Sequence, residues 1–309
     1  MKLSIVTTLY NSSSHINEFY SRIVSEAKKI TENYELVVVD DGSFDDSLQK
    51  VVTLQITDAK LIVIELSRNH GHHKAMMIGL SHCSGDYILM IDCDLEEEPE
   101  LLSQYWKSLK KNPENDVIYG LIKKRNTGFL KRIAGRFFYR ALNLLSGEDM
   151  PVDISFSRLM TKRYVMILRE FREREMYIGG LWHIAGFNQK AVQIDKGYKG
   201  DSTYTLSKKI AMVANAVTSF SNRPLLFIFY LGIMISLFSF AAGLIIAGRT
   251  LFFYQPLSGW TSLIVTIFFV SGIIIFCMGI IAVYLSKIFI ETKRRPYSTI
   301  KHIYRKNQN

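Results

Sequence analysis

The sequence has only three cysteines, and they lack the paired spacing of a disulfide framework or a zinc site. We expect Cys83, Cys93 and Cys277 to be reduced thiols in a cytosolic compartment. A GxxxxGK[ST] loop is also missing, which disfavours the nucleotide kinases. The N-terminus has a lone Lys2 and an apolar stretch too short for a signal peptide, so the first domain is expected to stay in the cytoplasm.

Acidic residues are scarce in the last segment of the chain. The net charge of +10 could indicate nucleic acid, an anionic substrate or an anionic membrane surface as a partner. From residue 287 onward, Glu291 is the single acid among the bases Lys287, Lys293, Arg294, Arg295, Lys301, Arg305 and Lys306. Because these bases follow an apolar run directly, they favour the cytoplasmic face of a membrane, and we expect no nucleic-acid partner.

Charged residues are also rare between Pro224 and Ser286. Residues 224–248 and 262–286 each form an apolar stretch of about 25 residues, enough to cross roughly 30 Å of hydrocarbon. We predict two transmembrane helices with both ends cytoplasmic and a short outer loop. Gly272, Gly279 and Ser286 recur with heptad spacing on one helix face, a pattern that permits close helix packing.

Strand and helix signals alternate in the first half of the chain. Apolar, β-prone runs are present at residues 3–10, 35–39, 60–66, 86–91 and 117–120, and helical stretches lie at about 15–31, 45–54 and 71–83. Strands that are apolar throughout and alternate with helices are typical of a parallel sheet covered on both faces. We therefore predict an α/β, Rossmann-like, mostly parallel sheet with ligands at the carboxyl ends of its strands.

Two acidic clusters follow such strands. Asp92 and Asp94 end the run at 86–91, where carboxylate oxygens suit Mg²⁺ or Mn²⁺ that bridges a substrate diphosphate; an acidic helix cap is the alternative. Asp40 and Asp41 end the run at 35–39, where a carboxylate can accept hydrogen bonds from a base or a ribose. An Asx turn at Gly42 is the alternative for one of the two aspartates. We therefore expect one aspartate to bind the base or ribose and the other to form the turn.

Two further clusters invite a functional interpretation. Residues 128–145 are expected to form a basic, aromatic, amphipathic helix whose arginines contact lipid phosphate rather than forming a merely solvated face. His70, His72 and His73 cluster, but we predict no transition-metal site there because the chemistry does not require one.

Several ordered motifs resemble the family 2 glycosyltransferases of GT-A fold. They are VDDGS at 39–43, SRNHG at 67–71, GD at 85–86, DCDL at 92–95 and PE at 99–100. RLM at 158–160, TSFS at 218–221 and ETKRRPY at 291–297 are similar to the polyprenyl-phosphate glycosyltransferases, which include bactoprenol glucosyltransferases and dolichol-phosphate mannose synthase.

The resemblance implies inverting transfer of a sugar from a nucleotide-diphosphate sugar, such as UDP-glucose, to undecaprenyl phosphate. The product would be a lipid-linked sugar for modification of a cell-surface glycan, O-antigen or cell wall. The resemblance also implies Mg²⁺ or Mn²⁺ as cofactor, a membrane location and a homo-oligomer, with a tetramer as one option. A phosphate acceptor is already ionised near neutral pH, so positioning and neutralisation of the leaving group should dominate over general-base catalysis.

The resemblance also implies site residues. For catalysis it indicates Asp92, Asp94, Asp153 and Arg158, and for the metal Asp92, Asp94 and Glu96. For the donor nucleotide it indicates Leu9, Tyr10, Asn11, Asp40, Asp41, Arg68, Asn69, Lys74 and Asp92. For the acceptor phosphate we expect Arg132, Arg136, Lys196 and Lys199. Substitution of Asp94 is expected to lower the activity more than substitution of any candidate base.

Some positions depart from the family pattern. The family's first strand usually ends with a proline before the aromatic and the asparagine, and the stretch Thr8-Leu9-Tyr10-Asn11 lacks it. Glu96 stands where the family has a glutamine, so we expect it as a third metal ligand. Residues 153–158 lack the usual glycine or second acid, and Lys196 and Lys199 would meet phosphate as point charges.

The expected organisation is a GT-A catalytic domain at 1–205, a juxtamembrane amphipathic segment at 206–223, a two-helix transmembrane domain at 224–286 and a basic cytoplasmic tail at 287–309. This arrangement places a multi-pass protein in the inner or plasma membrane. One alternative is a processive polysaccharide synthase, but its Gln-x-x-Arg-Trp motif and additional spans are not visible. The other is a non-catalytic partner of a flippase or glycan assembly complex, which would not need all four aspartates.

Overall fold

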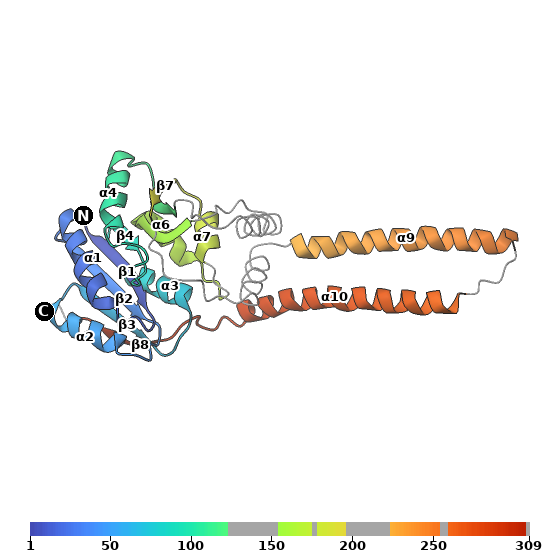
Figure 1. Cartoon of the computed structure of the whole chain (residues 1–309), viewed down its shortest axis with the longest axis horizontal. Helices are drawn as coiled ribbons and strands as arrows, with labels where there is room; N and C mark the ends of the chain where they lie inside the picture. Colours follow the sequence, from blue (N-terminus) through green and yellow to red (C-terminus); the bar gives the residue numbers. More distant parts are fainter. Residues whose placement is uncertain (123–153, 175–177, 196–222, 254–258, 307–309) are drawn as a thin grey trace. The chain divides into compact units, whose positions relative to one another are not determined.

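The computed structural model describes residues 1–122, 154–174, 178–195, 223–253 and 259–306 (Figure 1). These residues belong to two compact units. The first contains the described residues up to 195 together with those from Arg294 onward, and the second contains those from Arg223 to Lys293.

The first unit is an α/β domain around one sheet. Within the described residues the sheet has eight strands in the order β7-β5-β6-β4-β1-β2-β3-β8. Their bounds are β1 Leu3–Leu9, β2 Tyr34–Asp40, β3 Leu61–Leu66, β4 Tyr87–Met90, β5 Val117–Ile122, β6 Ile154–Thr161, β7 Gln189–Ile194 and β8 Ile300–Tyr304. The central strands β4, β1, β2 and β3 are parallel, and β6 and β8 are antiparallel to their neighbours. The predicted mostly parallel α/β sheet is therefore confirmed.

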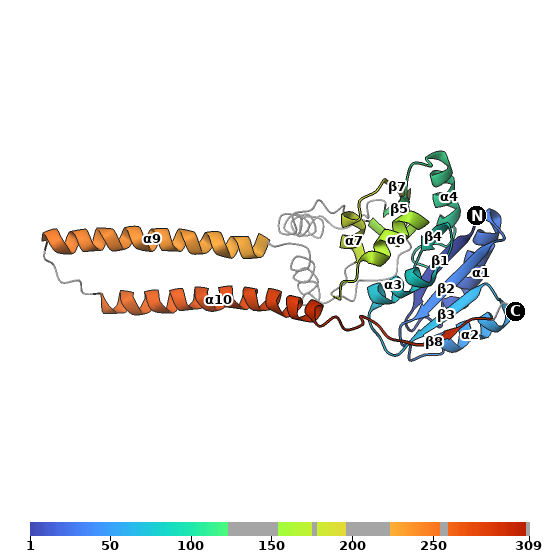
Figure 2. The same ribbon diagram turned by 180° about the vertical axis from the view of Figure 1, so that it is seen from behind.

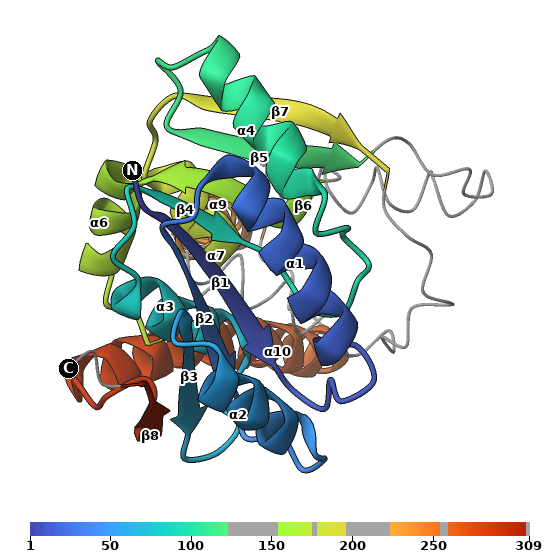
Figure 3. The ribbon, with the colours of Figure 1, turned by 90° about the vertical axis from the view of Figure 1, so that its left-hand side faces the viewer.

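Helices cover both faces of this sheet (Figure 3). They are α1 Ile16–Ile30, α2 Ser47–Thr57, α3 His72–His82, α4 Leu101–Lys111, α6 Lys162–Glu170 and α7 Ile178–Ile184. On one face, Ile5 of β1 belongs to the core that includes Phe19 of α1 and Leu102 of α4. On the other face α3 packs so closely that a Cβ on Gly79 would lie 2.4 Å from a methyl of Val6. Every residue of β1 and β2 is consequently buried.

The strand order reverses at β1. This strand pairs in parallel with β2, with Leu9 opposite Asp40, and on its other side with β4, where Val6 is opposite Met90. In open α/β sheets such a reversal leaves a crevice at the carboxyl ends of the two strands on either side. The segments that follow β1, β2 and β4 therefore reach the same edge of the sheet.

The C-terminal segment differs from the expected basic tail, because part of it joins the sheet. Strand β8 pairs with β3, with Ile303 opposite Ile64. Glu65 of β3 is buried and accepts hydrogen bonds from Lys301 and from Tyr304 Oη, the latter at 2.9 Å. The open edge of β3 and a buried carboxylate that needs a cation explain why this basic segment belongs to the first unit.

The second unit consists of two long helices that lie side by side, α9 Arg223–Phe253 and α10 Trp260–Thr292 (Figures 1 and 2). Both are longer than the predicted 224–248 and 262–286, since no proline interrupts them before Pro256 and Pro296. Each is long and apolar enough to cross a membrane. Among the side chains that the structure describes, none has an atom within 4 Å of a Cβ placed on Gly272 or Gly279.

Candidate active site

The ends of β1 and β2 are joined by hydrogen bonds between their loops. Asp41 N–H donates to Leu9 O at 2.9 Å, which extends the pairing of the strands. Beyond it, Asn11 N–H donates to Ser43 Oγ at 3.1 Å, and Phe44 N–H donates to Asn11 Oδ1 at 2.9 Å. The loops after the first two strands therefore form one surface at the carboxyl edge of the sheet.

Gly42 brings this surface against the loop that follows β3. Its φ of +71° is in the left-handed region, and a Cβ there would lie 2.7 Å from both Arg68 C and Asn69 N. Only glycine avoids the clash between these two backbones. The acidic turn after β2 and the Arg68–Asn69 loop are thus in direct contact.

Asp41 holds that loop in place. Its Oδ1 accepts from His70 N–H at 2.7 Å and its Oδ2 accepts from Gly71 N–H at 2.9 Å. Burial raises the pKa of this carboxyl group, and the two backbone hydrogen bonds oppose the rise. Both oxygens of Asp41 are already used by the protein.

Asp40 is different, because one of its oxygens is unused. The residue is 1% exposed, and burial raises its pKa. Its Oδ2 accepts from Ser43 N–H at 3.3 Å, whereas its Oδ1 has no hydrogen-bond partner among the described residues. A buried acceptor without a partner is costly and is expected to meet a donor from a ligand or from water. Of the two aspartates, Asp40 is therefore the one with an oxygen available to a donor from outside the described protein.

The segment after β4 brings Asp92 and Asp94 to the same edge. Asp94 Oδ1 accepts from Glu96 N–H at 3.0 Å, and the Asp92 side chain is 30% exposed. Leu95, with φ +62°, and Asn11, with φ +52°, both have left-handed backbones. They lie in the segments that follow β4 and β1. Such conformations are costly for residues other than glycine and are concentrated at functional sites.

The donor set of this segment suits a hard cation. Asp92 and Asp94 supply the carboxylate oxygens that Mg²⁺ and Mn²⁺ prefer. Within the described ranges, however, no group of three His, Cys, Asp or Glu side chains is close enough to hold a metal. The structure therefore does not gather Glu96 with the two aspartates, and its role as third ligand stays a prediction.

Glu97, which the sequence did not single out, points into the protein. It is 2% exposed, and its two carboxylate oxygens accept from Phe156 N–H at 3.1 Å and Ser157 N–H at 2.8 Å. Leu95, two residues earlier, has a left-handed backbone, and Glu97 faces the start of β6. Glu97 thus fixes the position of β6 beside the two aspartates.

His72 is another residue that sequence analysis did not assign to the site. Its Nδ1 lies 3.0 Å from Thr8 Oγ1, and its Nε2 lies 3.4 Å from Asp92 Oδ1. Burial lowers the pKa of His72 to about 4; His73 lowers it further and Asp94 opposes the shift, so the imidazole is neutral at physiological pH. The only signal in the sequence was the histidine cluster, which carries no information on which ring reaches the aspartates.

Arg158, expected on the acceptor side, is a buried cation. The residue is 1% exposed, and its Cζ lies 3.1 Å from the centre of the Trp182 ring. Its Nε and Nη2 have no hydrogen-bond partner among the described residues, and burial lowers its pKa to about 9. The guanidinium remains mostly protonated at neutral pH, but in this arrangement Trp182 covers it.

The remaining predicted residues are at the edge or outside the described ranges. The Leu9 side chain is fully buried, so only its backbone could meet a ligand. Tyr10 is 46% exposed and packs edge-to-face on exposed Phe44 with ring centres 6.4 Å apart, while Arg68 and Asn69 are exposed and Lys74 is half-buried. The helix expected at 128–145 and the residues Asp153, Arg132, Arg136, Lys196 and Lys199 lie outside the described residues.

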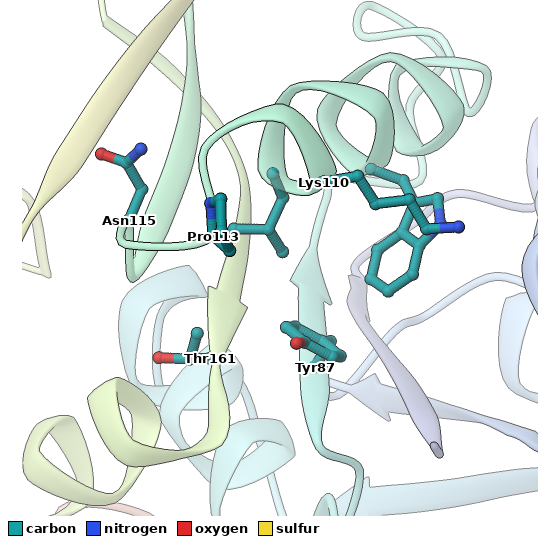
Figure 4. A pocket seen from close by; sticks show the side chains of 7 residues that line it. Tyr87, Lys110, Pro113, Asn115 and Thr161 are labelled. Atoms are coloured by element: carbon teal, nitrogen blue, oxygen red, sulfur yellow. The ribbon is translucent and has the colours of Figure 1, made fainter.

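A separate pocket lies at the other end of β4 (Figure 4). It is lined by Tyr87, Trp106, Leu109, Lys110, Pro113, Asn115 and Thr161. Tyr87 is the first residue of β4, whereas Asp92 lies two residues beyond its last residue, Met90. The lining also has no carboxylate, so this pocket is not part of the site formed by the aspartates.

Comparison with known proteins places the chain in a family. The family model described as glycosyl transferase family 2 matches residues 4–167. A protein described as a glycosyltransferase from Mycobacterium tuberculosis (strain CDC 1551 / Oshkosh) is 47% identical over 98% of this chain and 89% of its own length. A bactoprenol glucosyl transferase of Shigella phage SfII is 28% identical over 99% of this chain and 100% of its own.

A solved structure shares the fold of the sheet domain. Mannosyl-3-phosphoglycerate synthase from Rubrobacter xylanophilus superposes with a TM-score of 0.50 at 15% identity, over 70% of this chain and 72% of its own. At this identity the likeness concerns the fold alone. It agrees with the GT-A-like arrangement of parallel strands described above.

Proposed function

Since the chain belongs to glycosyl transferase family 2, it is a glycosyltransferase, and we propose that it transfers a sugar from a nucleotide-diphosphate sugar to polyprenyl phosphate. The carrying observation is that one sheet edge presents both the unused Asp40 oxygen and the carboxylates of Asp92 and Asp94. The polyprenyl acceptor is supported by the full-length match to a relative named bactoprenol glucosyl transferase.

The donor would bind across the loops after β1, β2 and β3. Asp40 Oδ1 would accept a hydrogen bond from the base or the ribose, and the exposed rings of Tyr10 and Phe44 offer an apolar surface for the base. Arg68 and Lys74 carry positive charge beside this surface. The amino terminus of α3 starts there as well, and helix amino termini favour phosphate groups.

Asp92 and Asp94 would hold Mg²⁺ or Mn²⁺. When bound, such an ion neutralises the diphosphate leaving group. The protein's own part is to fix the two carboxylates beside the donor and to bring the acceptor into line for inversion at the sugar carbon. A phosphate acceptor is already ionised, so a strong general base is not needed.

The acceptor would come from a membrane that α9 and α10 cross. In the described part of these helices many apolar side chains are exposed, among them Phe238 at 76% and Phe268 at 75%, and lipid would cover them. Asp153, Arg132, Arg136, Lys196 and Lys199 are proposed for the acceptor side, with Arg158 as a buried cation behind it. The proposed product is a lipid-linked sugar for a cell-surface glycan.

A panel of radiolabelled nucleotide sugars tests this function. The full-length protein in detergent is incubated with each donor, Mn²⁺ and undecaprenyl phosphate, and the label that partitions into the organic phase is counted. We expect lipid-linked label from at least one donor, and none when undecaprenyl phosphate is omitted. Absence of lipid-linked label with every donor, from protein that is folded in the detergent, would rule the proposal out.

A further inference from the structure

Three side chains from different elements meet beside the proposed metal site. Thr8 is the penultimate residue of β1, His72 is the first residue of α3, and Asp92 lies in the segment after β4. The imidazole lies between the other two, with Nδ1 3.0 Å from Thr8 Oγ1 and Nε2 3.4 Å from Asp92 Oδ1. A lone pair on Nε2 would face the aspartate oxygen unfavourably, which favours the tautomer with the ring proton on Nε2 and with Nδ1 accepting from the Thr8 hydroxyl.

The Thr8 hydroxyl has a specific partner in this chain. Thr8 belongs to the stretch that lacks the proline usual in the resembled family, and a proline carries no hydroxyl. The residue is 8% exposed, and its hydroxyl has His72 as its partner.

The ring of His72 is also held from its side. Phe156 packs against it with ring centres 4.5 Å apart, and Phe156 in turn packs on Trp182 at 5.5 Å. The Phe156 backbone is fixed by Glu97, which accepts its N–H at 3.1 Å. The imidazole therefore has little freedom to turn away from Asp92.

We propose that His72 is a positioning residue that orients the Asp92 carboxylate through Nε2–H, with Thr8 fixing the orientation of the ring. The inference rests on the proposed function, since it assigns His72 to the metal site of that reaction. A group that holds one oxygen of a ligating carboxylate directs the other oxygen toward the cation, and losing such a partner typically costs metal affinity about 10- to 100-fold. At 3.4 Å the Nε2 and Oδ1 atoms are in contact without forming a hydrogen bond, and we expect the distance to shorten into one when the cation and nucleotide bind, as contacts in unliganded sites often do.

Mn²⁺ affinity tests this role without relying on turnover. Free Mn²⁺ is measured by electron paramagnetic resonance during titration of the full-length protein in detergent, alone and with UDP. His72→Ala is expected to weaken Mn²⁺ binding about 10-fold or more. His72→Gln, whose Nε2 can take the place of the ring nitrogen, should restore part of the affinity. His82→Ala, at the far end of the same helix, serves as the matched control.

Position 8 gives a second pair of variants in case His72→Ala does not fold. Thr8→Val removes the hydroxyl at nearly constant volume and should weaken Mn²⁺ binding, whereas Thr8→Ser keeps the hydroxyl and should bind as the wild type does. Equal affinity in wild type, His72→Ala and Thr8→Val would overturn the positioning role and leave the proposed function intact.

Two further outcomes separate the alternatives. A nitrogen coupling in the spin-echo modulation of bound Mn²⁺ that is lost in His72→Ala would make His72 a direct ligand, which contradicts the positioning role. If the wild-type protein binds no Mn²⁺ even with UDP, the metal site of the proposed function fails, and the positioning role fails with it.

Discussion

Thr299 and His70 lie side by side although they are 229 residues apart, with Thr299 N–H directed at His70 Nε2 at 3.3 Å. Thr299 O also accepts from Ser67 N–H at 2.9 Å. Since His70 N–H is bound by Asp41, the segment that leads into β8 fixes the outer side of the same loop that Asp41 fixes from within. The C-terminal segment is thereby part of the proposed donor site.

Thr299→Pro should weaken donor binding. The substitution removes the N–H that meets His70, and loss of one such hydrogen bond corresponds to roughly 1 kcal/mol, or about 5-fold in the dissociation constant. Calorimetric titration with UDP measures the effect. Thr299→Ala retains the N–H and should bind as the wild type does; equal weakening in both variants would show that the backbone contact is irrelevant.

Asp40→Asn and Asp41→Asn should have opposite effects on folding. Burial raises the pKa of both carboxyl groups, so the charged form of each opposes folding at neutral pH. In Asp40→Asn the amide NH₂ can occupy the side where Oδ1 has no partner among the described residues, so the melting temperature is expected to hold or rise while UDP binding falls. Asp41→Asn places an amide against the N–H groups of His70 and Gly71 and should lower both stability and binding. A destabilised Asp40→Asn with normal UDP affinity would contradict the assignment.

The parallel core and its aspartates could be predicted from the sequence because both are local patterns. Continuous apolar runs indicate buried strands, and an acid directly after such a run must lie at the carboxyl edge. Strand β8 could not be predicted, since its five residues include Lys301 and His302 and its pairing with β3 is non-local. The contact of His72 with Asp92 could not be predicted for the same reason. It depends on how the start of α3 packs against the ends of β1 and β4.

The segment after Asp94 shows a second limit. Glu96 and Glu97 are adjacent and chemically alike, and the sequence offers only the family alignment to choose between them. In the structure Leu95 has a left-handed backbone just before the pair, and Glu97 rather than Glu96 is buried. A backbone conformation that is rare for leucine is not predictable from residue preferences.

The attachment of β8 should depend on pH through Glu65. Burial raises the pKa of Glu65, but the hydrogen bonds from Lys301 and Tyr304 outweigh it and hold the pKa below the ordinary 4.5. A carboxyl group with a lowered pKa stabilises the fold above pH 4.5, and this contribution is lost as the pH falls through the folded-state value. Hydrogen exchange over residues 300–304, corrected for intrinsic rates, should therefore rise in acid.

Glu65→Gln should show faster exchange in β8 already at neutral pH and no acid step. Glu32→Gln is a suitable control, because its carboxylate is 78% exposed in its pair with Lys60. If the acid step persists in Glu65→Gln, another group controls the attachment of the strand.

The proposed topology predicts that both ends of the α9–α10 pair are cytoplasmic. The bases that follow α10 and those that precede α9 should remain on the cytoplasmic side. Green fluorescent protein fused after Asn309 should fluoresce, and alkaline phosphatase inserted between the two helices should be active. The reverse pattern would place the sheet domain outside the cell and exclude access to cytoplasmic nucleotide sugars.

The most direct test of the account compares Asp94→Asn with Glu98→Gln in lipid-linked transfer. Glu98 is an exposed acid on the same segment and controls for the change of charge. With the donor that labels undecaprenyl phosphate, we predict that wild type and Glu98→Gln transfer equally with Mn²⁺ and lose transfer in EDTA. Asp94→Asn should lose at least about 100-fold of the rate, because the leaving diphosphate is no longer neutralised. Wild-type rates in Asp94→Asn, or transfer that persists in EDTA, would contradict the claim that Asp94 holds a cation on the leaving diphosphate.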